Sequence, residues 1–92
     1  MSAFKALADP TRRAILELLR NEDLSAGRIA EAFELSKPAI SHHLKLLTQA
    51  GLVQSQRRGK SIIYSLDTTA LHDMMRWAMD LMGETKGAND VE

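Results

Sequence analysis

Apolar residues recur at helical spacing in the N-terminal part of the chain, which predicts a brief helix followed by a longer one. Phe4 and Leu7 indicate the brief helix. The longer helix is expected over residues 10–19, where apolar side chains lie every three or four positions and charged side chains take the other side. Asp9 and Pro10 mark its start, because Asp caps free backbone N–H groups and Pro is tolerated at the first helical position.

Two further helices are predicted in close succession. Ser25 caps the first, which is expected to reach Phe33, and Ser36 caps the second, over residues 37–50, which Gly51 ends. The short connection between them predicts a helix-turn-helix. In this motif the N-terminal part of the second helix enters the major groove of DNA.

The second helix of this pair has an apolar face and a polar face that carries no acid. The residues at or near its polar face that we expect to contact DNA are Ser36, Lys37, Pro38, Ser41, His42 and Lys45. Lys37 and Lys45 are expected to bind phosphates, whereas Pro38, Ser41 and His42 are expected to influence which bases are accepted.

After Gly51 the period of the apolar pattern changes from about 3.6 to about 2, which predicts a β-hairpin. Its strands are expected over residues 52–57 and 61–66. A hairpin directly after a recognition helix is the wing of a winged helix, and Arg57, Arg58 and Lys60 are expected to reach phosphates or an adjacent minor groove. The alternative is a solubilising hairpin whose basic tip protects an edge strand from pairing.

The last predicted helix begins after Asp67 or Thr68, runs to about Met82, and has an apolar arc of roughly 200°. Covering a small domain takes only about half of that arc, so the surplus is expected to pack against the same helix of a second subunit. The residues expected at this interface are Phe4, Leu7, Leu71, Met74, Met75, Trp77, Ala78 and Met82. The alternative is that Phe4 and Leu7 of the same chain cover the face.

Length and composition predict one small domain over residues 1–82 and a flexible tail over residues 83–92. A domain of this size buries only about 60 to 65% of the surface of its unfolded chain, which favours oligomerisation. The 92 residues include no Cys, so disulfides, thiolate metal ligands and a cysteine nucleophile are excluded. No stretch reads as a secretory or membrane-spanning segment, and a cytoplasmic location is expected.

Charge is segregated along the chain although the formal net charge is zero. Residues 35–66 contain no Asp or Glu but carry five Lys and Arg residues together with His42 and His43. Such segregation creates a local positive field, whose natural partner is a polyanion. Together with the predicted elements, it indicates a mainly α-helical winged helix-turn-helix that binds double-stranded DNA, in the order α-α-α-α-β-β-α.

Other functions receive little support from the residues. His42, His43 and His72 form no pair at the i, i+4 spacing of helical metal ligands, and no cofactor is expected. His43 is expected to be a packed, hydrogen-bonded residue at the border of the core. An enzyme would need a nucleophile beside its base, but Ser41 and His42 point about 100° apart on a helix. A winged helix that binds only protein would be expected to carry acids on the helix over residues 37–50 and an uncharged wing tip. This chain has the reverse.

Four segments resemble the ArsR/SmtB family of bacterial winged-helix repressors. They are FKALADPTRR at residues 4–13, SKPAISHHLK at 36–45, AGLV at 50–53, and RGK at 58–60 followed by YSL at 64–66. The resemblance covers residues 3–82 and is closest to the SdpR-like autorepressor group. It implies a homodimer built from the first and last helices, a repressor whose two recognition helices read an inverted repeat in a promoter, and, for that group, no metal inducer.

The sensing motifs of the family are missing from this chain. Metal-sensing members carry Cys-Val-Cys where this chain has Ser25, Ala26 and Gly27, and soft metals need thiolates. Other members place metal ligands at positions that here are Thr68, Ala70, Leu81 and Glu84, which leaves one possible ligand of four. The resemblance thus leaves open a constitutive autorepressor, release by a protein partner, or an apolar effector at the Met-rich last helix.

Overall fold

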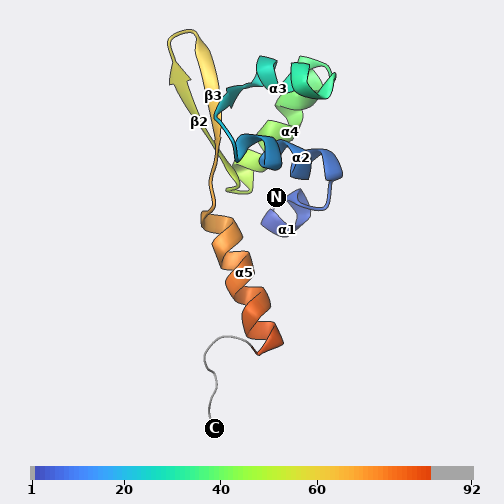
Figure 1. Ribbon diagram of the computed structural model, residues 1–92, viewed down its shortest axis with the longest axis vertical. Coiled ribbons are helices and arrows are strands. Elements are labelled where there is room, and N and C mark those ends of the chain that lie inside the picture. The colour runs from blue at the N-terminus through green and yellow to red at the C-terminus, as the bar shows by residue number, and fades with distance from the viewer. Residues whose placement is uncertain (1, 84–92) are drawn as a thin grey trace.

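The computed structural model describes residues 2–83, so all of the tail expected over residues 83–92 except its first residue lies outside them. The chain folds as a winged helix-turn-helix (Figure 1). Its elements in order are α1 (Ala3–Ala6), α2 (Pro10–Leu19), β1 (Leu24–Ser25), α3 (Ala26–Phe33), α4 (Lys37–Gln49), β2 (Val53–Arg58), β3 (Ser61–Leu66) and α5 (Thr69–Met82).

Three helices begin at the capping residues that the sequence predicts. The carboxylate of Asp9 accepts a hydrogen bond from the backbone N–H three residues later at 3.0 Å. The hydroxyls of Ser25 and Ser36 accept equivalent bonds at 3.3 and 3.2 Å. Helix α5 differs, because Thr68 makes no side-chain cap and the Asp67 carboxylate accepts the N–H of Thr69 instead, at 3.0 Å. These bonds satisfy backbone donors that have no partner within a helix.

The sheet has one strand more than the sequence predicts. The two residues of β1 pair with β3, Leu24 opposite Tyr64 and Ser25 opposite Ile63, so β3 lies between β1 and β2. The predicted order of elements is therefore corrected by one inserted strand. A strand of two residues has no period to detect, and Ser25 serves both as its last residue and as the cap of α3. This pairing fixes the start of α3 against the wing.

The core lies beneath α4, whose apolar face is completely covered. Ile40, Leu44 and Leu47 of this helix have no exposed surface. They belong to one buried cluster with residues from α1, α2, α3 and the start of β2, among them Ile15 and Ile29. Burial of this face fixes how α4 is rotated, and its polar face is thereby turned toward solvent.

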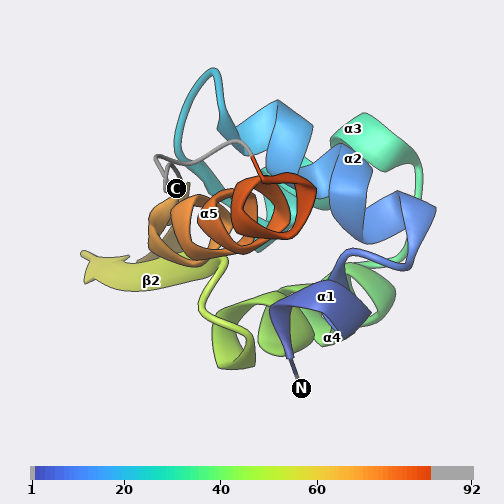
Figure 2. The same cartoon turned by 90° about the horizontal axis from the view of Figure 1, so that it is seen from below.

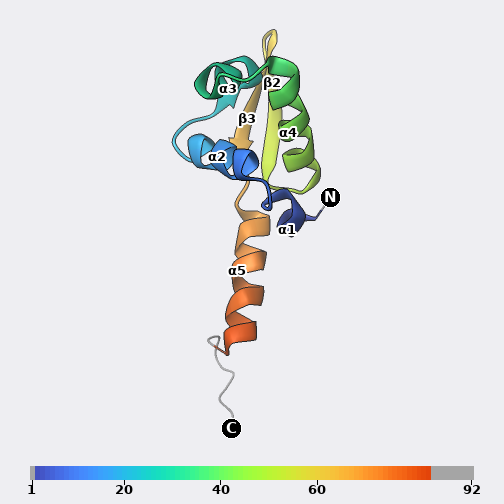
Figure 3. The same cartoon turned by 90° about the vertical axis from the view of Figure 1, so that its right-hand side faces the viewer.

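Helix α5 extends away from the winged domain, at the end opposite to the tip of the hairpin (Figures 1 and 3). Seen end-on from below, it lies beneath the domain, next to α1 (Figure 2). None of its residues is buried. Within residues 2–83, no helix combines the length and apolar character needed to cross a membrane.

The Asp9 cap predicts an acid-dependent part of the stability. Its pKa is lowered chiefly by the hydrogen bond from the Arg12 backbone, against an opposing effect of burial, with help from the positive potential of Arg12 and His43. Because the folded pKa lies below the unfolded value of about 3.9, this stabilisation is complete above that value and is lost as the pH falls through the folded pKa. Asp9→Asn should therefore be less stable than wild type at neutral pH, and the difference should shrink in acid.

Urea unfolding of both proteins, from neutral pH down to about pH 2, measures this difference. Asp9→Ala is the control, because it removes the capping oxygen and is expected to cost about 1 kcal/mol at neutral pH. Parallel curves for Asp9→Asn and wild type across the acid range would contradict the assignment.

Candidate nucleic-acid interface

The residues expected to contact DNA lie on one end of the molecule. The start of α4 and the tip of the hairpin are both at the top of Figure 3, opposite α5. All nine expected residues are exposed, namely Ser36, Lys37, Pro38, Ser41, His42, Lys45, Arg57, Arg58 and Lys60. Two segments that are separate in the sequence thus form one surface, whose cations all come from the acid-free stretch.

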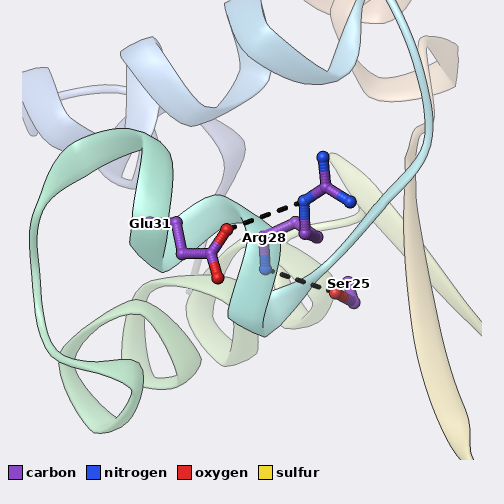
Figure 4. Close-up of polar contacts among 3 residues, drawn as sticks. All are labelled: Ser25, Arg28 and Glu31. Carbon is purple, nitrogen blue, oxygen red and sulfur yellow. Dashed lines mark hydrogen bonds and ion pairs between the residues drawn. The ribbon is translucent and has the colours of Figure 1, made fainter.

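The charges of this surface are not neutralised by neighbours. The ion pairs of the described residues, Arg28 with Glu31 at 3.7 Å and Arg76 with Asp73 at 3.4 Å, both lie outside residues 35–66. Figure 4 shows the first of them beside the Ser25 cap, on the outer side of α3. Among residues 2–83, no cation of the acid-free stretch is held by a carboxylate, so these side chains are available to phosphates.

A cleft connects the recognition helix to the wing. Its volume is about 330 Å³. It is lined by Ser25, Ala26, Gly27, Lys37, Ser41, Lys60, Ser61, Ile62 and Tyr64. Lys37 of α4 and Lys60 of the wing therefore border the same hollow, although 23 positions separate them in the sequence.

The wing presents its cations on two faces. Side chains of successive strand residues point to opposite faces, so Arg57 and Arg58 diverge. Arg57 pairs with Ile62 and Arg58 pairs with Ser61, both of which line the cleft, and the Arg58 guanidinium donates to Gln56 Oε1 at 3.5 Å. Gly59 turns the tip with a φ of 64°, a conformation that favours glycine. The structure therefore separates two arginines that the sequence analysis treats alike.

Helix α4 is also tied to α1 through a single guanidinium. Arg12 Nε donates to the carbonyl of Ala6 at 2.8 Å and Nη2 donates to that of Lys5 at 3.4 Å. Nη1 of the same side chain lies 3.4 Å from Nδ1 of His43. His43 is half-buried and hydrogen-bonded, as the sequence predicts, and it follows the exposed His42. Arg12 thus connects the N-terminal helix to the recognition helix, a role that the sequence analysis missed.

No metal centre is present in the part of the chain that the structure describes. Within residues 2–83, no three side chains of His, Cys, Asp or Glu come close enough together to hold an ion. The rings of His42 and His43 lie 6.1 Å apart, centroid to centroid. The lack of a metal response remains a prediction.

A second exposed surface lies on α1 and α5. Phe4 and Trp77 meet edge to face, with ring centroids 5.3 Å apart, yet they remain 54% and 55% exposed. Met75, Leu81 and Met82 are also more than half exposed. A hollow of about 340 Å³, lined in part by Phe4 and Trp77, lies between the two helices. We call these five exposed residues the α1/α5 apolar surface.

The residues expected at the dimer interface divide into two groups in the structure. Leu7 and Leu71 are half-buried and pack partly against the core of their own chain. Phe4 contacts the edge of the Trp77 ring but leaves that ring more than half exposed. Leu81, outside the expected set, is 72% exposed. The helical period alone places Leu81 on the apolar arc, so this signal was available in the sequence.

A helix-turn-helix with a cationic wing defines the class of winged helix-turn-helix DNA-binding proteins. The family described as "Bacterial regulatory protein, arsR family" matches residues 9–55. The chain belongs to this family and is a DNA-binding transcription regulator.

Relatives and solved structures agree with this assignment. The chain is 50% identical over 90 residues to the transcriptional repressor SdpR of Bacillus subtilis, and the alignment covers 98% of both chains. It is 46% identical over 69 residues to the HTH-type transcriptional regulator Rv2034 of Mycobacterium tuberculosis, which covers 75% of this chain and 64% of that one. A crystal structure of a possible transcriptional regulator for arsenical resistance matches with a TM-score of 0.79 at 32% identity, covering 88% and 84% of the two chains.

Proposed function

We propose that the protein is a dimeric repressor that binds an inverted-repeat operator and controls its own gene. The observation that carries the proposal is the exposed surface formed by the polar face of α4 and the wing, which has five cations and no acid. The identity to a repressor over nearly the full length of both chains supports the direction of control. We expect the protein to act in the cytoplasm, where a bacterial regulator meets its DNA partner.

The α1/α5 apolar surface supports the homodimer. Its five large side chains are each more than half exposed, and exposed apolar side chains gathered on neighbouring helices mark interaction sites. A two-fold axis would bring each copy of the surface against its own equivalent, which suits self-association. The dimer would then present two copies of α4, and the centres of the operator half-sites should lie about 34 Å apart.

Within the DNA-facing surface, phosphate contacts and base contacts fall to different residues. Arg58 and Lys60 of the wing, with Lys37 and Lys45 of α4, are assigned to phosphates, and they mainly set affinity. Ser41, His42 and Pro38 lie on the exposed first turns of α4 and are assigned to base edges. The operator sequence should depend on the second group.

Two substitutions test this division. Arg58→Ala should weaken binding to all DNA sequences by a similar factor and reduce the salt dependence by about one released counterion, because one phosphate contact is lost. His42→Ala should instead change the ratio of affinities between the operator and single-base variants of it. Fluorescence anisotropy across a salt series measures both quantities. Equal loss of discrimination in both variants would refute the assignment.

The proposed function as a whole is tested with the DNA upstream of the gene. The purified protein is titrated onto this fragment and onto a scrambled fragment, across a salt series, with and without added zinc. Site-specific binding that weakens steeply with salt and does not respond to zinc is expected. Failure to bind the upstream fragment at low salt would overturn the proposal of autorepression.

A further inference from the structure

The cleft between the helix-turn-helix and the wing has the chemistry of a site for an anion. Lys37 and Lys60 border it from two different elements, and none of the nine lining residues is acidic. Three serines, Ser25, Ser41 and Ser61, also line it. Each hydroxyl carries a donor, and the oxygen of Ser25 already accepts the backbone N–H of Arg28, so its own proton is free to be donated.

One wall of the cleft is apolar. Ile62 of β3 is 45% exposed, and Tyr64, two residues further on the same face of the strand, is half-buried. A free inorganic anion gains nothing from such a wall. A sugar-phosphate unit does, because its ribose carbons can lie against Ile62 while its phosphate meets the lysines and hydroxyls.

Gly27 lines this cleft, and the fold does not require a glycine at this position. Its φ is not positive, so its backbone conformation is open to other residues. A Cβ at this position would meet only Ser25 Oγ, at 4.0 Å, which is ordinary contact. Glycine weakens a helix, yet here it serves neither a turn nor tight packing within the chain. The absent side chain keeps the hollow open.

We propose that this cleft holds one phosphate of the DNA backbone and the sugar attached to it. The proposal rests on the proposed function and assigns a site to the strand that passes between the groove entered by α4 and the groove reached by the wing. It adds Ser25, Gly27 and Ser61 to the DNA-binding residues. The contact is independent of sequence, so it sets affinity and the relative placement of helix and wing.

Filling the cleft tests the site without removing a charge. Gly27→Leu places a side chain in the hollow and replaces glycine by a good helix former, so thermal stability should equal or exceed that of wild type. Binding to operator and to scrambled DNA should both fall, by roughly tenfold or more, and the slope of log K against log salt should decrease by about 0.9 for one lost phosphate. Gly27→Ala should show a smaller loss in the same direction.

Ala32→Leu is the matched control, because it makes a comparable addition at an exposed position of the same helix that does not line the cleft. It should bind DNA like wild type. Wild-type affinity and salt slope in Gly27→Leu would overturn the phosphate site while leaving the proposed function intact. Failure of the wild-type protein to bind DNA would instead overturn the proposed function.

A titration with free phosphate tests whether the cleft binds a phosphate of the DNA backbone or a free anion. Inorganic phosphate is titrated into the protein without DNA, at constant ionic strength, and thermal stability is recorded for wild type and Gly27→Leu. The DNA-backbone site predicts no difference between the two responses at millimolar phosphate, because the ribose contact is missing. Stabilisation of wild type alone would show that the cleft serves a free anion and would overturn the assignment to DNA.

Discussion

Trp77→Glu is expected to convert the protein to a monomer and to weaken operator binding by at least about 100-fold. A dimer engages two half-sites at once, and linking two binding modules raises overall affinity by about 10² to 10⁴. Trp77 is 55% exposed on α5 and contacts Phe4 within the α1/α5 apolar surface. A carboxylate there would be desolvated without a partner when two such surfaces meet.

The fold of the subunit should survive this substitution, because no residue of α5 is buried in the isolated chain. Sedimentation equilibrium measures the association state, far-UV circular dichroism the helix content, and a gel-shift titration the operator affinity. His72→Glu is the control: it also introduces a carboxylate, at an exposed position about 140° away around the helix. A dimeric Trp77→Glu protein would rule out the proposed interface.

Leu44→Ala is expected to lower the free energy of unfolding by about 2 to 5 kcal/mol, a large part of the total for a domain of this size. Leu44 has no exposed surface and lies in the middle of the buried face of α4. The loss combines the transfer free energy of the missing carbons with the cost of the cavity left behind. Urea unfolding monitored by circular dichroism gives the value.

Lys45→Ala, at the next position of the same helix, is the control for this effect. Lys45 is exposed, so its replacement should change stability by less than about 0.5 kcal/mol. It should nevertheless weaken DNA binding, because a phosphate contact is lost. The two variants therefore separate the two faces of α4. A loss below about 1 kcal/mol in Leu44→Ala would show that this face is not the packing centre of the domain.

The helices could be predicted from local signals because their determinants lie within a few residues of one another. The side chains of Asp9, Ser25 and Ser36 cap helices at the predicted positions, and Gly51, with a φ of 79°, follows the end of α4. Strand β1 could not be predicted in this way. Its two residues are held by β3, which lies far along the chain, so no local pattern reveals the pairing.

The DNA-facing surface shows the same division. Charge and helical period predict its residues, but they did not indicate that Lys37 and Lys60 border one cleft. They also did not reveal that the strand pleat separates Arg57 from Arg58, although alternation along a strand follows from local geometry. The link from Arg12 to His43 joins α2 to α4 across 31 positions and depends on how these helices pack.

The sequence by itself determined the helix boundaries, the polarity of each helix face, the cationic wing and the family. These properties follow from capping, periodicity and charge order, which act between near neighbours. Only the tertiary structure decided that β1 attaches α3 to the wing, that Gly27 opens onto a cleft between two lysines, and that no residue of α5 is fully buried within the chain. Each of these depends on packing between distant segments, which brings together residues that local patterns cannot relate.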